Sequence, residues 1–252
     1  MRSLRELADP PGHRAAAWIA ALALMGGSVA FLAGGRAHPA IDAALAGPDQ
    51  FFLVFAQEVA HTHGWHAMHL LILIGPLCWA VAAPALLDML LPRARAVISI
   101  ARSFLLLAGA LWAVAFVLDG FGAPVYARAI VAAETADPAR AILTVFEANA
   151  VVMSRLGLVS WVTGGLGMAV LGGSLLSPNA LGRWGFALGA LGIVLGVWPL
   201  LAAMQGEYAA GPFTSGLWKY NALAVGFWYM ALATCAFFRR RPSRGQACDA
   251  VA

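Results

Sequence analysis

The sequence contains little charge. Only 11% of its 252 residues are Asp, Glu, Lys or Arg, whereas roughly a quarter of the residues in soluble domains are charged. Hydrophobic residues make up 62% of the chain, and the mean hydropathy is +0.79. This composition excludes an ordinary soluble domain and predicts several membrane-embedded segments. Because no long polar segment interrupts the chain, we expect one transmembrane domain over residues 1–252.

Cysteine and the common catalytic motifs are also scarce. The three cysteines, Cys78, Cys235 and Cys248, form no CxxC pair, which argues against a disulfide framework and a thiolate metal site. The sequence has no GxSxG, HExxH, Walker loop or dinucleotide fingerprint, so the enzyme classes that depend on them are excluded. The motifs therefore leave open whether the protein is an enzyme.

Six apolar stretches are long enough to cross a bilayer, which requires about 20 apolar residues. Each is expected to be helical because lipid offers the backbone no hydrogen-bond partner. The fourth is long enough to tilt or to begin outside the hydrocarbon layer. The first exceeds the usual length of a signal-peptide core, so we expect it to be retained. The prediction is an all-α, polytopic membrane helix bundle with helices at about 15–34, 67–91, 96–118, 148–176, 184–204 and 217–238.

Basic residues alternate with acidic ones along the connecting segments. Arginines occur at the N-terminus, after the second helix, after the fourth, and in the tail 239–252. The positive-inside rule then predicts that both termini are cytoplasmic, in a multi-pass protein of the inner membrane. This distribution favours contact with anionic lipid head groups over nucleic acid. The expected partners are the lipid bilayer and other membrane subunits.

A glycine stripe marks the fifth predicted helix. Its members repeat at a spacing of four, three and four residues, which allows close backbone approach inside a membrane. The glycine-rich fourth helix is the expected neighbour. The alternative is that the stripe clears room for a flat cofactor or a lipid. The stripe consists of Gly185, Gly189, Gly192 and Gly196.

The stretch SWVTGGLGMAVLGGSLLSPNALGRWGFALGALGIVLG, residues 160–196, resembles a family of uncharacterised bacterial six-helix membrane proteins. Its GGSLLSPNALGRWG segment follows that family's order of glycine-rich helix, Ser/Pro loop, Leu-Gly pair and second glycine-rich helix. The resemblance implies the six-helix fold and no particular activity. The histidine-rich stretch described next is not part of the family pattern.

Four of the six histidines lie in HTHGWHAMH, residues 61–69. If one helix continued through Gly64, four side chains would share an arc of about 140°. The alternative is that Gly64 breaks the helix, which would free His61 and His63 to fold back. Imidazole together with a carboxylate suits Zn, Cu or Fe, so we expect a transition metal or metallo-cofactor here. His63 would point elsewhere. A proton relay, or histidines that merely sit at the membrane interface, are the alternatives. The expected ligands are His66 and His69, followed by His61 and Glu58.

Further polar residues fall at the same predicted membrane face. Charged groups within spans are costly and usually paired or functional. Arg155 is expected to pair with Glu147 or Asp119, or to bind an anionic group. These residues would form a polar vestibule that consists of Asp119, Glu147, Arg155, Glu207 and Lys219.

These patterns favour an integral membrane protein with an outward-facing histidine and carboxylate site, as a component of a membrane oxidoreductase. Haem is less favoured, because only the second helix offers histidine within a span. A transporter, a binder of lipids or small molecules, and a structural subunit of a membrane complex remain open alternatives.

Overall fold

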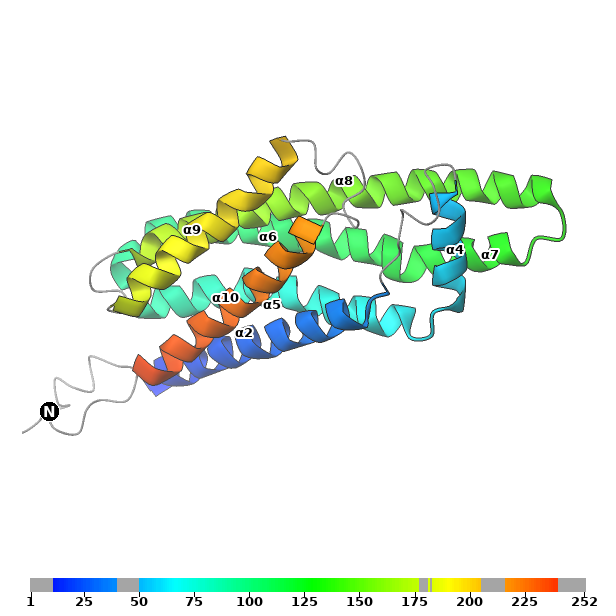
Figure 1. Ribbon diagram of the computed structural model, residues 1–252. Helices are drawn as coiled ribbons and strands as arrows, with labels where there is room; N and C mark the ends of the chain where they lie inside the picture. The colour runs from blue at the N-terminus through cyan, green and yellow to red at the C-terminus, as the bar shows by residue number, and fades with distance from the viewer. Residues whose placement is uncertain (1–10, 40–49, 177–180, 182, 205–215, 240–252) are drawn as a thin grey trace, which may run out of the picture.

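The computed structural model describes residues 11–39, 50–176, 181, 183–204 and 216–239. These residues form helices and no β-strand. Six of the helical segments are long and apolar enough to cross a membrane, and they lie side by side in one elongated bundle (Figure 1). The predicted fold class, an all-α bundle of six membrane-spanning helices, is confirmed.

The long helices follow the predicted spans closely. Beside them, the structure contains a short helix before the second span, a 3₁₀ turn and a π-helical turn. In chain order the elements are α2 (Pro11–Ala37), α4 (Phe51–His61), α5 (Trp65–Leu90), η1 (Pro92–Ala94), α6 (Arg95–Val117), η2 (Leu118–Gly122), α7 (Ala123–Val131), α8 (Ala136–Leu175), α9 (Arg183–Met204) and α10 (Gly216–Arg239).

The third and fourth spans are longer than predicted. The third continues through η2 and α7 as far as Val131, and α8 begins at Ala136 and runs for 40 residues. At about 1.5 Å per residue, α8 is about 60 Å long, twice the thickness of the hydrocarbon layer. Hydropathy detects only the part of a helix that is apolar on all sides. It therefore missed the amphipathic first third of α8, which packs on protein.

A cap covers one end of the bundle, and it consists of α4, α7 and residues 136–154 of α8. In Figure 1, α4 crosses the ends of the long helices, and α7 and α8 project beyond them. The cap packs on the first turn of α5 around an apolar core that is separate from the bundle core. This core consists of Phe55, Ala56, Val59, Trp65, Met68, Ala123, Ala127, Ile130 and Phe146.

Glycines hold α8 and α9 together at backbone distance. A Cβ on Gly196 would lie 2.4 Å from the carbonyl oxygen of Gly165, and one on Gly172 would lie 2.7 Å from that of Gly189. Gly192 lies against the Trp228 indole. Gly185, the first member of the predicted stripe, is buried. Gly189 and Gly196 therefore face α8, as expected for packing, and Gly192 lies between α8 and α10.

Arg155 lies elsewhere than the sequence suggested. The stretch of α8 from Arg155 to Leu175 is about 30 Å long, which is about the thickness of the hydrocarbon layer. Arg155 is exposed, and among the described residues it has no acidic partner within 4.0 Å. The predicted ion pair is therefore absent from this part of the chain. Because α8 is longer than the hydrocarbon layer is thick, its first part lies outside that layer, and Arg155 falls at the edge of the layer.

Candidate metal centre

The histidine-rich stretch forms a corner between two helices. Helix α4 ends at His61, and α5 begins at Trp65 after Gly64, whose φ of 79° lies in the left-handed region that glycine adopts at little cost. The assumption of one unbroken helix through Gly64 is therefore wrong, and the predicted 140° arc does not exist. Two of the expected ligands lie on α4 and the other two on α5.

The first turn of α5 packs on the π-helical turn η2. The Trp65 Nε1–H donates to the carbonyl oxygen of Asp119 at 2.9 Å, and the Nδ1–H of His66 donates to that of Gly120. A π-turn interrupts the regular α-helical ladder and is frequent at functional sites. Here its carbonyl groups find partners on α5, which fixes the position of Asp119 relative to this helix.

His69 and Asp119 meet one turn deeper in the structure. The His69 Nε2 lies 2.9 Å from Oδ2 of Asp119. His69 is 1% exposed and Asp119 is 4% exposed, so water does not screen the contact. His38, just after the end of α2, completes the group. One ligand atom from each of the three residues lies within 4.8 Å of the others.

The remaining imidazole nitrogens show which atoms are available for binding. Nδ1 of His69 lies 2.7 Å from the carbonyl oxygen of Trp65, and Nδ1 of His38 lies 3.0 Å from that of Pro39. Because a carbonyl oxygen only accepts, each Nδ1 must carry the hydrogen. Each Nε2 of a neutral ring then presents a lone pair. Such backbone contacts orient the histidine ligands of many metal sites.

Two features show where a positive partner would fit in this group. The Nε2 lone pair of a neutral His69 faces a carboxylate oxygen, and two acceptors attract each other only with a proton or a cation between them. The other carboxylate oxygen of Asp119, Oδ1, is buried without a hydrogen-bond partner, which is costly for a polar atom. A bound cation would satisfy both atoms.

The surroundings of His38 favour its neutral form. Burial is the main cause that lowers the pKa of His38, and the neighbouring His69 lowers it further, against the opposing effects of the Pro39 carbonyl and Asp119. A neutral imidazole is the form that binds a metal. The electrostatics of this residue therefore agree with the geometry.

Aromatic rings and close helix contacts hold the three side chains in place. The ring centroid of His69 lies 4.6 Å from that of Trp65 and 5.8 Å from that of Phe116. A Cβ at Gly120 would come within 2.8 Å of the His69 Cβ, and one at Gly34 within 2.7 Å of the Met68 carbonyl oxygen. These glycines let η2 and α2 approach α5 closely enough to assemble the group.

The structure places one of the four expected ligands in this group, namely His69. His66 stacks on Phe121, with ring centroids 5.1 Å apart. His61 contacts the carbonyl oxygen of Gln57 at 2.7 Å, and Glu58 accepts a hydrogen bond from Thr62; both residues are exposed.

The predicted vestibule is only partly described. Asp119 belongs to the group, and Glu147 is half-buried on α8. Glu207 lies outside the described residues, as does the side chain of Lys219. The sequence pattern alone did not join His38 and Asp119 to the histidine stretch. The signal was that both follow the predicted end of a span, at the membrane level where the second span begins.

Comparison with protein-family models, with curated proteins and with solved structures finds no match. The family resemblance of residues 160–196 therefore stays a prediction.

Proposed function

We propose that the protein binds a first-row transition metal ion through His38, His69 and Asp119. The single observation that carries this proposal is the buried pairing of a histidine Nε2 with a carboxylate whose second oxygen has no partner. Both histidines already donate Nδ1–H to backbone carbonyl groups, so their Nε2 atoms need no rearrangement of the tautomer to bind.

The donor set narrows the choice of metal. Two imidazoles and one carboxylate suit Fe(II) or Zn(II), and such three-residue sets leave coordination positions open for water or substrate. Two ligand atoms at right angles around a metal, each bonded at about 2.1 Å, are about 3.0 Å apart. The distance of 2.9 Å between Nε2 of His69 and Oδ2 of Asp119 is close to this value. An open position makes the centre suited to catalysis or electron transfer as part of a membrane oxidoreductase.

The centre belongs, in this proposal, to the outer face of the inner membrane. From Leu90 to His69, α5 covers about 30 Å, so the centre lies at the cap end of the hydrocarbon layer. Among the described residues, the arginines that begin α6 and α9, Arg95 and Arg183, lie at the opposite end, and the positive-inside rule makes that end cytoplasmic. A reporter fused after Asp137 is expected to be periplasmic. A cytoplasmic signal would move the centre to the inner face.

Metal binding can be tested directly on the full chain in detergent. We would strip the purified protein with a chelator, titrate it with Co²⁺, Zn²⁺ or Fe²⁺, and measure bound metal by elemental analysis and the Co²⁺ absorption spectrum. The expected result is one ion per chain. The variants His38→Ala, His69→Ala and Asp119→Asn should each weaken binding at least tenfold, because each removes or neutralises a ligand.

The matched control uses the histidines that the corner places outside the group. His61→Ala and His63→Ala should leave the affinity unchanged, because both side chains are exposed. Unaltered stoichiometry in a folded His69→Ala protein would contradict the assignment. So would loss of metal in the double variant His61→Ala/His63→Ala. Wild-type protein that binds no metal under any of these conditions would reject the proposal.

A further inference from the structure

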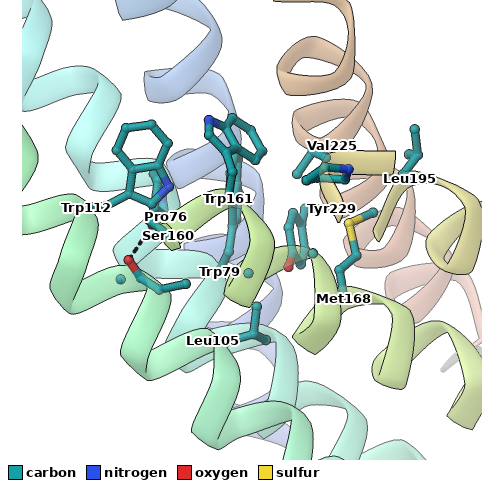
Figure 2. Close-up of a pocket in the computed structure, with 15 residues that line it drawn as sticks. Pro76, Trp79, Leu105, Trp112, Ser160, Trp161, Met168, Leu195, Val225 and Tyr229 are labelled. Atoms are coloured by element: carbon teal, nitrogen blue, oxygen red, sulfur yellow. Dashed lines mark hydrogen bonds between the residues drawn. The ribbon is translucent and has the colours of Figure 1, made fainter. Parts of the chain in front are cut away.

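A second candidate site lies deeper in the bundle, on the membrane side of the metal centre. It is a cavity of about 40 Å³ that opens in part to the surface of the bundle. Its walls come from α5, α6, α8, α9 and α10 (Figure 2). Gly165, which contributes to the wall, lies about 15 Å from the end of α8 at Leu175, so the cavity is at mid-bilayer depth. Its opening therefore faces lipid.

The walls of the cavity are mostly aromatic. Trp79, Trp112, Trp161 and Tyr229 line it, and Figure 2 shows Trp112 and Trp161 near each other in the wall. Trp79 stacks on Tyr229 with ring centroids 4.8 Å apart, and Trp161 meets Trp112 edge to face. Flat rings prefer aromatic faces of this kind. The lining therefore suits a planar ring better than a flexible acyl chain.

Two polar groups in the lining lack a protein partner. Among the described residues, neither the indole N–H of Trp112 nor the hydroxyl of Tyr229 forms a hydrogen bond. Both groups are donors, and buried indole and phenol groups usually find a partner. Figure 2 shows the Trp112 nitrogen on the side of the other lining residues. A ligand with carbonyl oxygens would supply the missing acceptors.

Aromatic contacts connect this cavity with the metal centre. Trp112 stacks on Phe116, with centroids 4.7 Å apart, and the Phe116 ring lies 5.8 Å from that of His69. Trp112 thus lines the cavity, and Phe116, on which it stacks, contacts His69, a proposed ligand of the metal. This juxtaposition favours a redox-active ring over other planar carbonyl compounds.

We propose that the cavity binds the ring of a membrane-soluble quinone, with Trp112 and Tyr229 as hydrogen-bond donors to its carbonyl oxygens. The cavity of about 40 Å³ takes a carbonyl group and the adjoining ring edge, and the remainder of the ring lies in its opening against the tryptophans. The choice of a redox-active ring rests on the proposed metal site, whereas the cavity and its donors do not.

The test is saturation binding of a tritiated 1,4-benzoquinone with a short alkyl tail to the full chain in lipid nanodiscs. It is run on metal-free protein, so that quinone binding is measured independently of whether the protein binds a metal. Trp112→Phe and Tyr229→Phe each retain an aromatic ring and remove one donor. Each should raise the Kd about three- to tenfold, the effect of one lost hydrogen bond. Trp198→Phe is the matched control, because Trp198 is exposed and does not line the cavity.

Three outcomes would overturn the proposal. The first is that the wild-type protein does not bind the quinone. The second is an unchanged Kd in both donor variants. The third is equal competition by decanol, which has a chain and no ring and would identify the cavity as a pocket for lipid tails. Quinone binding without metal binding would reject the metal centre alone, and metal binding without quinone binding would reject the cavity site alone.

Discussion

The α8–α9 contact and the α5–η2 contact both bring helices very close together, but they use opposite chemistry. Between α8 and α9, glycines meet backbone atoms, and the contact depends on the absence of side chains. Between α5 and η2, Trp65, His66 and His69 reach carbonyl and carboxylate oxygens of the π-turn. The first contact lies within the hydrocarbon layer and the second at its edge.

The difference shows what each region can do. Apolar surface is not driven together in lipid as it is in water, so close van der Waals packing is the main source of stability inside the bundle. At the edge of the bilayer, polar groups can be assembled because the cap shields them from water while the backbone supplies partners. The rigid bundle thus forms a support on which the polar group is held.

The largest effect in this comparison is expected from substitutions at two adjacent glycines of α8, Gly172 and Gly173. A Cβ on Gly172 would lie 2.7 Å from the Gly189 carbonyl oxygen, whereas a Cβ on Gly173 would meet nothing within 4 Å. Gly172→Leu should therefore lower the free energy of unfolding by about 3 kcal/mol or more, and Gly173→Leu should leave it nearly unchanged. An SDS unfolding titration in micelles measures both. Equal stability of the two variants would mean that α8 and α9 do not touch here.

A smaller effect is expected from the buried pair at the edge of the bilayer. In metal-free protein a proton must lie between Nε2 of His69 and the Asp119 carboxylate, so Asp119→Leu leaves a buried polar group without its partner, which should cost about 2 kcal/mol. The cost is moderated because Oδ1 of Asp119 is already without a partner. The double variant His69→Leu/Asp119→Leu should be less destabilised than the sum of the two single variants. Strictly additive losses in the same titration would show that the two side chains do not interact.

The π-turn provides the next test. Trp65→Phe keeps an aromatic ring in the cap core but removes the donor to the Asp119 carbonyl oxygen. We expect a loss of about 1 kcal/mol, since one buried acceptor loses its partner. Trp198→Phe, at an exposed position of α9, should have no effect in the same assay. A loss in both variants would point to a general effect of removing indole rings.

The fold was largely predictable because hydropathy and glycine spacing are local signals. Each span can be recognised from an apolar run of about 20 residues, and Gly189, Gly192 and Gly196 repeat along one helix. The cap was only partly predictable. Its helices place apolar residues on one side only, so their identity as packed elements depends on neighbours that hydropathy does not report.

The candidate metal centre was harder to predict because its members are far apart in sequence. His69 and Asp119 are separated by 50 residues, and His38 follows the end of another span. A continuous helix would group histidines that are neighbours in the chain, such as His61 and His66. Gly64 breaks that helix with a left-handed residue. A single glycine therefore decides which side chains meet. The sequence shows that Gly64 can break the helix, but it does not show whether the helix breaks there.

Arg155 should give the smallest effect, and it tests whether the edge of the bilayer has been located correctly. It is exposed on α8, and among the described residues it has no acidic partner within 4.0 Å. A long cationic side chain at this depth can extend its guanidinium to the head groups at little cost. Arg155→Gln should therefore change the free energy of unfolding by less than about 0.5 kcal/mol, as is usual for exposed positions. Glu147→Gln, alone or together with Arg155→Gln, serves as the control, and the two effects should add. A loss above about 1 kcal/mol for Arg155→Gln, rescued by Glu147→Gln, would show instead that Arg155 is a buried member of an ion pair and that the hydrocarbon layer extends further toward the cap.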